Sequence, residues 1–303
     1  MAGSKWSISY GPPALDPIWG PQTSAVNFCE EVRERDVQDY IVTKYIGEFW
    51  NTITSAIYIL YGIHGLRRFK RQDVTIFDVV NLPYWGLIGV GIFSGLYHTS
   101  LKYHTQMSDE LSMHLAIGTV MHRVFTFEQP LATQRKVTAL ILGVLVPFFI
   151  YHCVADEFVL HVILFLGMVI LITWKTRSII SARVPSETDR RKLANLVHFG
   201  SFCAALAYGL WNIDVNFCGT LTRWKHALGM PWGIALEFHG YWHILTSITA
   251  YNSMAIIEYL TSQSDESAQG VGFAWPSRQV LRNIAAGGSA IGTTSKNQQY
   301  KNR

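Results

Sequence analysis

The stretch VTALILGVLVPFFIYHCV, Val137 to Val154, decides the class of fold. None of its residues is Asp, Glu, Lys or Arg. A helix that crosses a bilayer needs about 20 mainly apolar residues. The stretch therefore predicts a membrane-spanning helix.

Apolar runs of similar length recur on both sides of this stretch. With it, they predict an all-α polytopic membrane protein, a seven-transmembrane helix bundle, with spans at 47–66, 78–97, 108–127, 136–154, 157–175, 194–213 and 234–258. A large soluble helical bundle is the alternative, and the alternating charge of the loops disfavours it. The first and last spans contain polar residues, which are costly at membrane depth and point to function.

Composition agrees with this class. Of the 303 residues, 49% are hydrophobic and 15% are charged, against roughly 25% charged in a typical soluble domain. A net charge of +4, scattered along the chain, gives no indication of nucleic-acid binding. The composition also excludes a disordered chain and a disulfide-scaffold peptide.

Basic residues cluster between spans, at 67–71 and 175–192. Because basic loops stay in the cytosol, we expect a lumenal N-terminus and a cytosolic C-terminus. The expected domains are a lumenal segment 1–46, a seven-helix catalytic domain 47–258 and a mobile cytosolic tail 259–303. No secretory signal is visible in the polar first 40 residues.

Two histidines in the last span, His239 and His243, are four residues apart. On a helix they lie about 40° apart on one face, so two imidazoles can chelate one zinc ion, as in HExxH helices. The alternative is packing or hydrogen bonding inside the bundle. Most other histidines, His152 and His161 among them, suggest no special role.

The predicted topology brings further polar residues to the same depth. His98 ends the second span, Asp109 and Glu110 open the third, and Glu48 opens the first, all on the outer side. Three histidine ligands would leave one open position, the arrangement of catalytic zinc, which activates water. Asp109 could then take the proton of that water.

Ser94 precedes His98 by one helical turn and so faces the same way. We expect its hydroxyl to stabilise a developing oxyanion, although a small residue for helix packing is the alternative. The N-terminal oxygen donors Asn27, Glu30, Glu31, Asp39 and Glu48 suit Ca²⁺, with a solvated acidic loop as the alternative. Cys29 and Cys218 both fall on the outer side, where an oxidising lumen permits a disulfide.

Five blocks of sequence, in order over about residues 19–258, resemble the alkaline ceramidases. They are Trp19-Gly20-Pro21 with Asn27-Phe28-Cys29-Glu30-Glu31, the run from Tyr45 to Thr52, Ser94-x-x-x-His98 with Asp109-Glu110-Leu111, Trp211-Asn212-Ile213-Asp214 with Phe217-Cys218, and the run from Phe238 to Thr246. The N-terminal block and the short loops are similar to the fungal branch, which favours phytoceramide.

The resemblance implies an intramembrane zinc amidase that hydrolyses ceramide or phytoceramide to a fatty acid and a sphingoid base, with reverse synthesis possible. It implies zinc ligands His98, His239 and His243, catalytic Ser94 and Asp109, and a Cys29–Cys218 disulfide. It implies calcium ligands Asn27, Phe28 (through its carbonyl), Glu30, Asp39 and Glu48. The lipid substrate would enter from the bilayer of the endoplasmic reticulum or Golgi, and no protein partner is expected.

The chain departs from the family pattern at the calcium loop. The family usually has Asp-Trp where this chain has Asn27-Phe28, and seven residues, Val32 to Gln38, four of them charged, separate Glu31 from Asp39. A retained intron or a shifted splice site would account for this insertion, which splits the loop. Transcript sequencing across codons 29–40 would test that origin, because an mRNA population uniformly carrying the seven codons would contradict it.

Two other functions compete with the amidase. A seven-helix receptor of the progestin/adiponectin type would use a similar zinc site structurally, but the short cytosolic loops leave little surface for signalling partners. An ion transporter would need charged residues along a whole path, and the fourth and fifth spans carry almost none.

Overall fold

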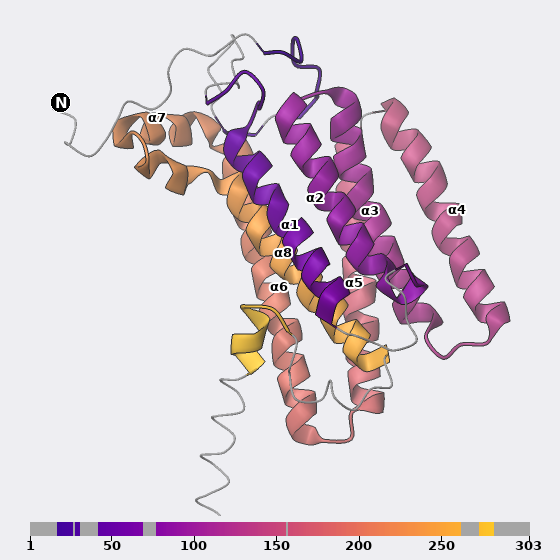
Figure 1. The fold of residues 1–303 in the computed structure, drawn as a ribbon. Coiled ribbons are helices and arrows are strands. Elements are labelled where there is room, and N and C mark those ends of the chain that lie inside the picture. The colour runs from indigo at the N-terminus through magenta and orange to yellow at the C-terminus, as the bar shows by residue number, and fades with distance from the viewer. Residues whose placement is uncertain are drawn as a thin grey trace, which may run out of the picture.

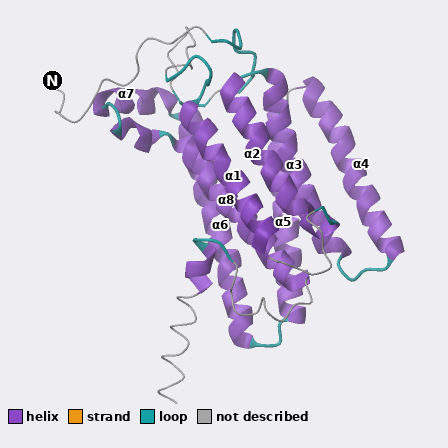
Figure 2. Ribbon diagram, viewed as in Figure 1, coloured by secondary structure: helices purple, strands orange, loops and turns teal. Residues whose placement is uncertain are grey.

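The computed structural model describes residues 17–26, 28–30, 42–68, 77–155, 157–261 and 273–281. Within these ranges the chain is helical, apart from short connections and one isolated bridge. The long helices lie side by side in one bundle (Figures 1 and 2). They are α1 (Phe49–Arg68), α2 (Leu82–Ser100), α3 (Tyr103–Thr126), α4 (Leu131–Ala155), α5 (Phe158–Arg183), α6 (Glu187–Asn216) and α8 (Phe238–Thr261).

Four of the described helical segments are long and apolar enough to cross a membrane, which suggests a multi-pass membrane protein. They are Val79–Ser100, Leu131–Ala155, Phe158–Arg183 and Glu187–Asn216. Large apolar side chains on α4 and α5, such as Leu140, Ile150 and Ile170, are exposed on the bundle surface. A soluble monomer rarely exposes so continuous an apolar surface.

Helix ends are set by local chemistry. Pro83 stands in the first turn of α2, where its missing N–H removes no helical hydrogen bond. Ser186 caps α6 by accepting a hydrogen bond from the Asp189 N–H. The carboxylate of Glu157 caps α5 by accepting hydrogen bonds from the backbone amides of Val159 and Leu160.

Glycines let α1 and α2 approach closely. A Cβ atom at Gly91 would lie 2.9 Å from the backbone oxygen of Ser55, and one at Gly62 would lie 2.9 Å from that of Tyr84. Small residues at helix contacts are a general feature of membrane bundles. The close contact brings the N-terminal half of α1 beside Ser94 and His98 of α2.

Two segments differ from the sequence-based expectation. The region expected as an outer loop before the last span forms α7 (Cys218–Leu228) and the short helix η2 (Trp232–Leu236), which project from the end of the bundle where α8 begins (Figure 1). The tail was expected to be mobile from about residue 262. Its described part, 273–281, packs onto the bundle with Phe273 buried, and Tyr251 accepts a hydrogen bond from the Ala274 amide.

Candidate active site

Three histidines from two helices meet at one end of the bundle. His98 lies in the last turn of α2, and His239 and His243 lie in the first turns of α8. All three are buried, and their ligand atoms lie within 4.8 Å of one another. This cluster, which we call the histidine triad site, could hold a metal ion.

The nitrogen atoms of these rings divide into two sets. His98 Nδ1 contacts Glu48 Oε2 at 2.5 Å, and His243 Nδ1 contacts Thr54 Oγ1 at 2.9 Å. His98 Nε2 and His239 Nδ1 are buried without a hydrogen-bond partner among the described residues. Leaving buried polar atoms unsatisfied costs about 1–3 kcal/mol each, so the site fits a bound zinc ion that takes up these lone pairs.

Ser94 and Asp109 lie beside the histidine triad site. Ser94 accepts a hydrogen bond from the Ser55 hydroxyl at 3.0 Å, and Ser94 and Asp109 line the same cavity. A polar contact therefore links α1 to α2, and the Asp109 carboxyl of α3 borders the cavity beside it. A carboxylate in this position can accept a proton from a neighbouring group.

Glu110 is not part of this arrangement, although sequence reasoning placed it at the same depth. Its carboxylate turns away from the triad and contacts His152 Nε2 at 2.5 Å and Gln106 Nε2 at 3.0 Å. Neighbouring residues on a helix point about 100° apart. Asp109 and Glu110 therefore face different neighbours.

A cavity of about 260 Å³ opens in front of the histidine triad site. Ser94, Asp109, His239 and His243 line its polar part. The remaining wall is largely apolar and comes from several helices, with Leu87, Val120, Phe165, Val169, Trp211 and Met254 among its residues. A polar head with an apolar body suits an amphipathic ligand.

The N-terminal segment covers the histidine triad site. The Phe28 ring stacks on the His239 ring, with centroids 3.5 Å apart, and the Phe28 amide donates to Glu48 Oε1 at 3.3 Å. Glu30 caps α1, because its carboxylate accepts hydrogen bonds from the amides of Trp50 and Asn51 at 2.5 and 2.8 Å. Negative charge at a helix N-terminus is favourable.

The expected calcium ligands are placed only in part. Glu30 and Glu48 are buried in one network, whereas Asn27, Asp39 and the insertion between Glu31 and Asp39 lie outside the described residues. Burial, together with the nearby carboxylates of Glu237 and Glu48, raises the pKa of the Glu30 carboxyl. A divalent cation beside these carboxylates would offset their mutual repulsion.

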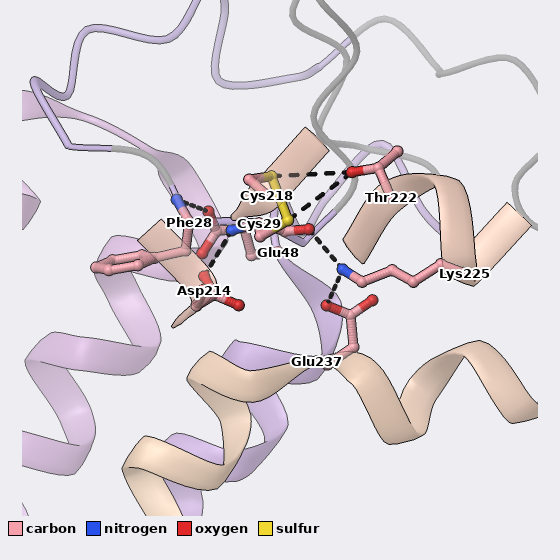
Figure 3. Close-up of a disulfide and its surroundings, with 8 residues drawn as sticks. All are labelled: Phe28, Cys29, Glu48, Asp214, Cys218, Thr222, Lys225 and Glu237. Carbon is pink, nitrogen blue, oxygen red and sulfur yellow. Dashed lines mark hydrogen bonds and ion pairs between the residues drawn. A yellow bond between two sulfur atoms is a disulfide. The ribbon is translucent and has the colours of Figure 1, made fainter. Parts of the chain in front are cut away.

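A disulfide joins Cys29 to Cys218 at the start of α7 and anchors the N-terminal segment (Figure 3). Next to it, the fully buried Lys225 pairs with Glu237 Oε2 at 2.6 Å and donates to the Cys29 carbonyl at 2.5 Å. Asp214 accepts a hydrogen bond from the Cys29 amide at 2.8 Å. These contacts connect α6, α7 and the end of η2 to the N-terminal segment that covers the histidine triad site.

Sequence reasoning missed Lys225, Thr54 and Glu237. A lysine in an expected outer loop would ordinarily be solvated, and the sequence carries no sign that a distant glutamate neutralises it. Thr54 lies in an apolar run, and its pairing with His243 arises from the packing of α1 on α8. Only the four-residue spacing of Thr54 and Tyr58 along one face of α1 could have indicated a polar stripe.

Comparison with known proteins places this geometry in a family. A sequence model of the Ceramidase family matches residues 20–285. The chain belongs to the ceramidase family. The alkaline ceramidase YPC1 of Saccharomyces cerevisiae is 28% identical over 273 residues, which cover 84% of this chain and 82% of that protein. The alkaline ceramidase 3 of Mus musculus is 28% identical over 248 residues, covering 79% and 85%.

More distant relatives bear the same name. The alkaline ceramidase of Arabidopsis thaliana is 23% identical over 257 residues, which cover 82% of this chain and 88% of that protein. The described ceramidase bundle, with its histidine triad site, lies almost wholly within the matched residues. Alkaline ceramidases are amide hydrolases, so family membership makes this chain an enzyme of that class.

Proposed function

We propose that this ceramidase-family chain is an intramembrane amidase that hydrolyses the N-acyl amide of ceramide or phytoceramide, releasing a fatty acid and a sphingoid base. The observation that best supports this proposal is the position of the histidine triad site. It lies beside the Ser94–Asp109 pair at the polar head of an apolar cavity. The relatives' names supply the substrate class.

His98, His239 and His243 would hold a zinc ion. The buried nitrogen atoms His98 Nε2 and His239 Nδ1, which lack a hydrogen-bond partner among the described residues, support this assignment. When bound, zinc would supply Lewis-acid activation of water and of the amide carbonyl. Glu48 and Thr54 hold the rings of His98 and His243 in orientation through their Nδ1 atoms, the usual role of outer-shell partners.

Asp109 would accept the proton of the attacking water and return a proton to the leaving sphingoid amine. Ser94 would donate its hydroxyl hydrogen to the oxygen on which negative charge develops. Ser55, which donates to Ser94, keeps that hydroxyl pointed toward the cavity. The apolar cavity wall would hold the acyl and sphingoid chains and exclude bulk water.

The same proposal includes the membrane topology, the calcium ligands and the location of the protein. Helices α1, α3 and α8, with the four apolar helices, would form seven spans between a lumenal segment 1–46 and a cytosolic tail 259–303, in the endoplasmic reticulum or Golgi membrane. Calcium would bind the lumenal segment through Asn27, the Phe28 carbonyl, Glu30, Asp39 and Glu48. Because hydrolysis in a lipid phase is reversible, the same residues would also support ceramide synthesis.

The test is fatty-acid release by the purified full-length protein in detergent, from phytoceramide and from ceramide, with and without Ca²⁺. Asp109→Asn should lower turnover roughly 10²–10⁴-fold, as expected for loss of a general base, and should retain zinc. His243→Ala should lose turnover and the zinc ion of the histidine triad site. Asp189→Asn, an exposed carboxylate on α6, is the matched control and should leave both unchanged.

Two results would contradict the proposal. Full turnover by His243→Ala would remove the zinc assignment. Wild-type protein that carries zinc but releases no fatty acid from either lipid would favour the receptor hypothesis or an inactivating insertion.

A further inference from the structure

A second cluster of ionisable side chains borders the same cavity as the histidine triad site. Glu110 of α3, His152 of α4 and His161 of α5 are all buried, and their ligand atoms lie within 4.8 Å of one another. We call them the three-helix cluster. Sequence reasoning gave His152 and His161 no role, because each is a single histidine near the end of an expected helix.

The contacts of the His152 ring require a proton or a metal ion between that ring and Glu110. Its Nδ1 lies 3.1 Å from the Glu157 carbonyl oxygen, which can only accept, so Nδ1 carries the hydrogen. A neutral ring then presents an Nε2 lone pair to Glu110 Oε2, 2.5 Å away. Two acceptors at this distance repel, so either a proton or a metal ion must lie beside them.

Two further imidazole nitrogens in the same place have nothing to bond. His161 Nδ1 and His114 Nε2 are buried without a hydrogen-bond partner among the described residues. The His114 and His161 rings meet edge to face with centroids 4.7 Å apart. A single proton between His152 and Glu110 leaves both atoms unsatisfied, whereas a metal ion would engage the ring of His161.

We propose that Glu110, His152 and His161 form a second metal site that takes a divalent transition ion of the zinc class. Imidazole nitrogens with one carboxylate oxygen suit Zn²⁺, whereas Ca²⁺ and Mg²⁺ prefer sites made wholly of oxygen atoms. The His114 ring contacts the His161 ring, and its Nε2 has no hydrogen-bond partner among the described residues, so His114 is a candidate additional donor.

The surroundings hold this carboxylate in place, as outer-shell partners do in metal sites. Gln106 Nε2 donates to Glu110 Oε1 at 3.0 Å, and Gln106 Oε1 accepts from the Ala25 amide at 2.7 Å. The site would therefore tie α4 and α5 to α3 and, through Gln106, to the N-terminal segment. Because Glu110 and His161 line the cavity, a metal here would brace their part of the cavity wall.

The test is the number of zinc ions per chain. Full-length protein in detergent is stripped with a chelating resin, equilibrated with ZnCl₂, desalted and analysed by elemental mass spectrometry. We expect about two zinc ions in the wild type, about one in His161→Gln, about one in His243→Gln and none in the double variant. His122→Ala removes a histidine of α3 that contacts Thr138 outside the cluster, and should keep two.

The outcomes separate this proposal from the proposed function. Wild type with one zinc ion, unchanged in His161→Gln, overturns the second site and leaves the histidine triad site intact. Two zinc ions that fall to one in His161→Gln but persist in His243→Gln support the second site and contradict the triad.

Two further measurements guard against misfolded variants. Glu110→Gln keeps the side-chain volume and should also lose one zinc ion, so two ions retained in a folded Glu110→Gln protein overturn the site. Zinc-edge anomalous scattering from wild-type crystals needs no variant. It should give a peak between α3, α4 and α5, and a peak at the triad alone overturns the proposal.

Discussion

Substitution of Glu48 by Gln tests whether the histidine triad site depends on the segment before α1. The Glu48 carboxylate is fully buried and accepts hydrogen bonds from His98 Nδ1, the Asn51 side-chain amide and the Phe28 backbone amide. Gln keeps the volume but removes the negative charge. The contact to His98 then changes from a charge-assisted to a neutral hydrogen bond.

The magnitude follows from that single contact. A buried hydrogen bond to a charged group contributes about 1.5–3 kcal/mol, against about 1 kcal/mol for a neutral one. The difference, about 0.5–2 kcal/mol, corresponds to roughly 2–30-fold in affinity. Removal of the outer-shell partner of a metal-bound histidine typically costs about 10–100-fold, which overlaps this range. We therefore expect zinc affinity to fall roughly 10–30-fold in Glu48→Gln.

The assay is competition for zinc against a fluorescent chelator, followed by fatty-acid release at saturating zinc. Glu258→Gln is the matched control, because Glu258 is a buried carboxylate of α8 that accepts a 2.6 Å hydrogen bond from Tyr84, away from the triad. It should bind zinc as the wild type does. Unchanged zinc affinity in Glu48→Gln would refute the assigned role of Glu48.

Two further predictions concern the contacts that anchor the N-terminal segment over the histidine triad site. Lys225→Met leaves the buried Glu237 carboxylate without its ion-pair partner. We therefore expect the free energy of unfolding to fall by about 3–5 kcal/mol, measured as a lower Tm. Addition of Glu237→Gln should recover part of this loss, and a Lys225→Met protein as stable as the wild type would contradict the pairing. Cys29→Ser and Cys218→Ser should each lower stability by about 2–5 kcal/mol. The double variant should be no worse than either single one, and an additive loss would show that the two cysteines do not act as one bond.

The sequence alone accounts for much of the helical arrangement. The seven predicted spans overlap α1, α2, α3, α4, α5, α6 and α8, because long apolar runs can satisfy their backbone in a bilayer only as helices. The four-residue spacing places His239 and His243 on one face of α8. Counting reversals of direction along the chain correctly brought His98 and Asp109 to the same end of the bundle.

Only the tertiary structure decided which atoms meet. Rotation of α3 directs Asp109 to Ser94 and Glu110 to His152, a choice that no local pattern contains. The buried Lys225–Glu237 pair depends on how α7 and η2 pack, and Glu30 caps α1 although the sequence suggested a calcium ligand. Helix formation depends on neighbouring residues, whereas side-chain pairing depends on contacts between helices far apart in the chain. The sequence therefore determined the helices and their common depth, and packing determined the chemistry between them.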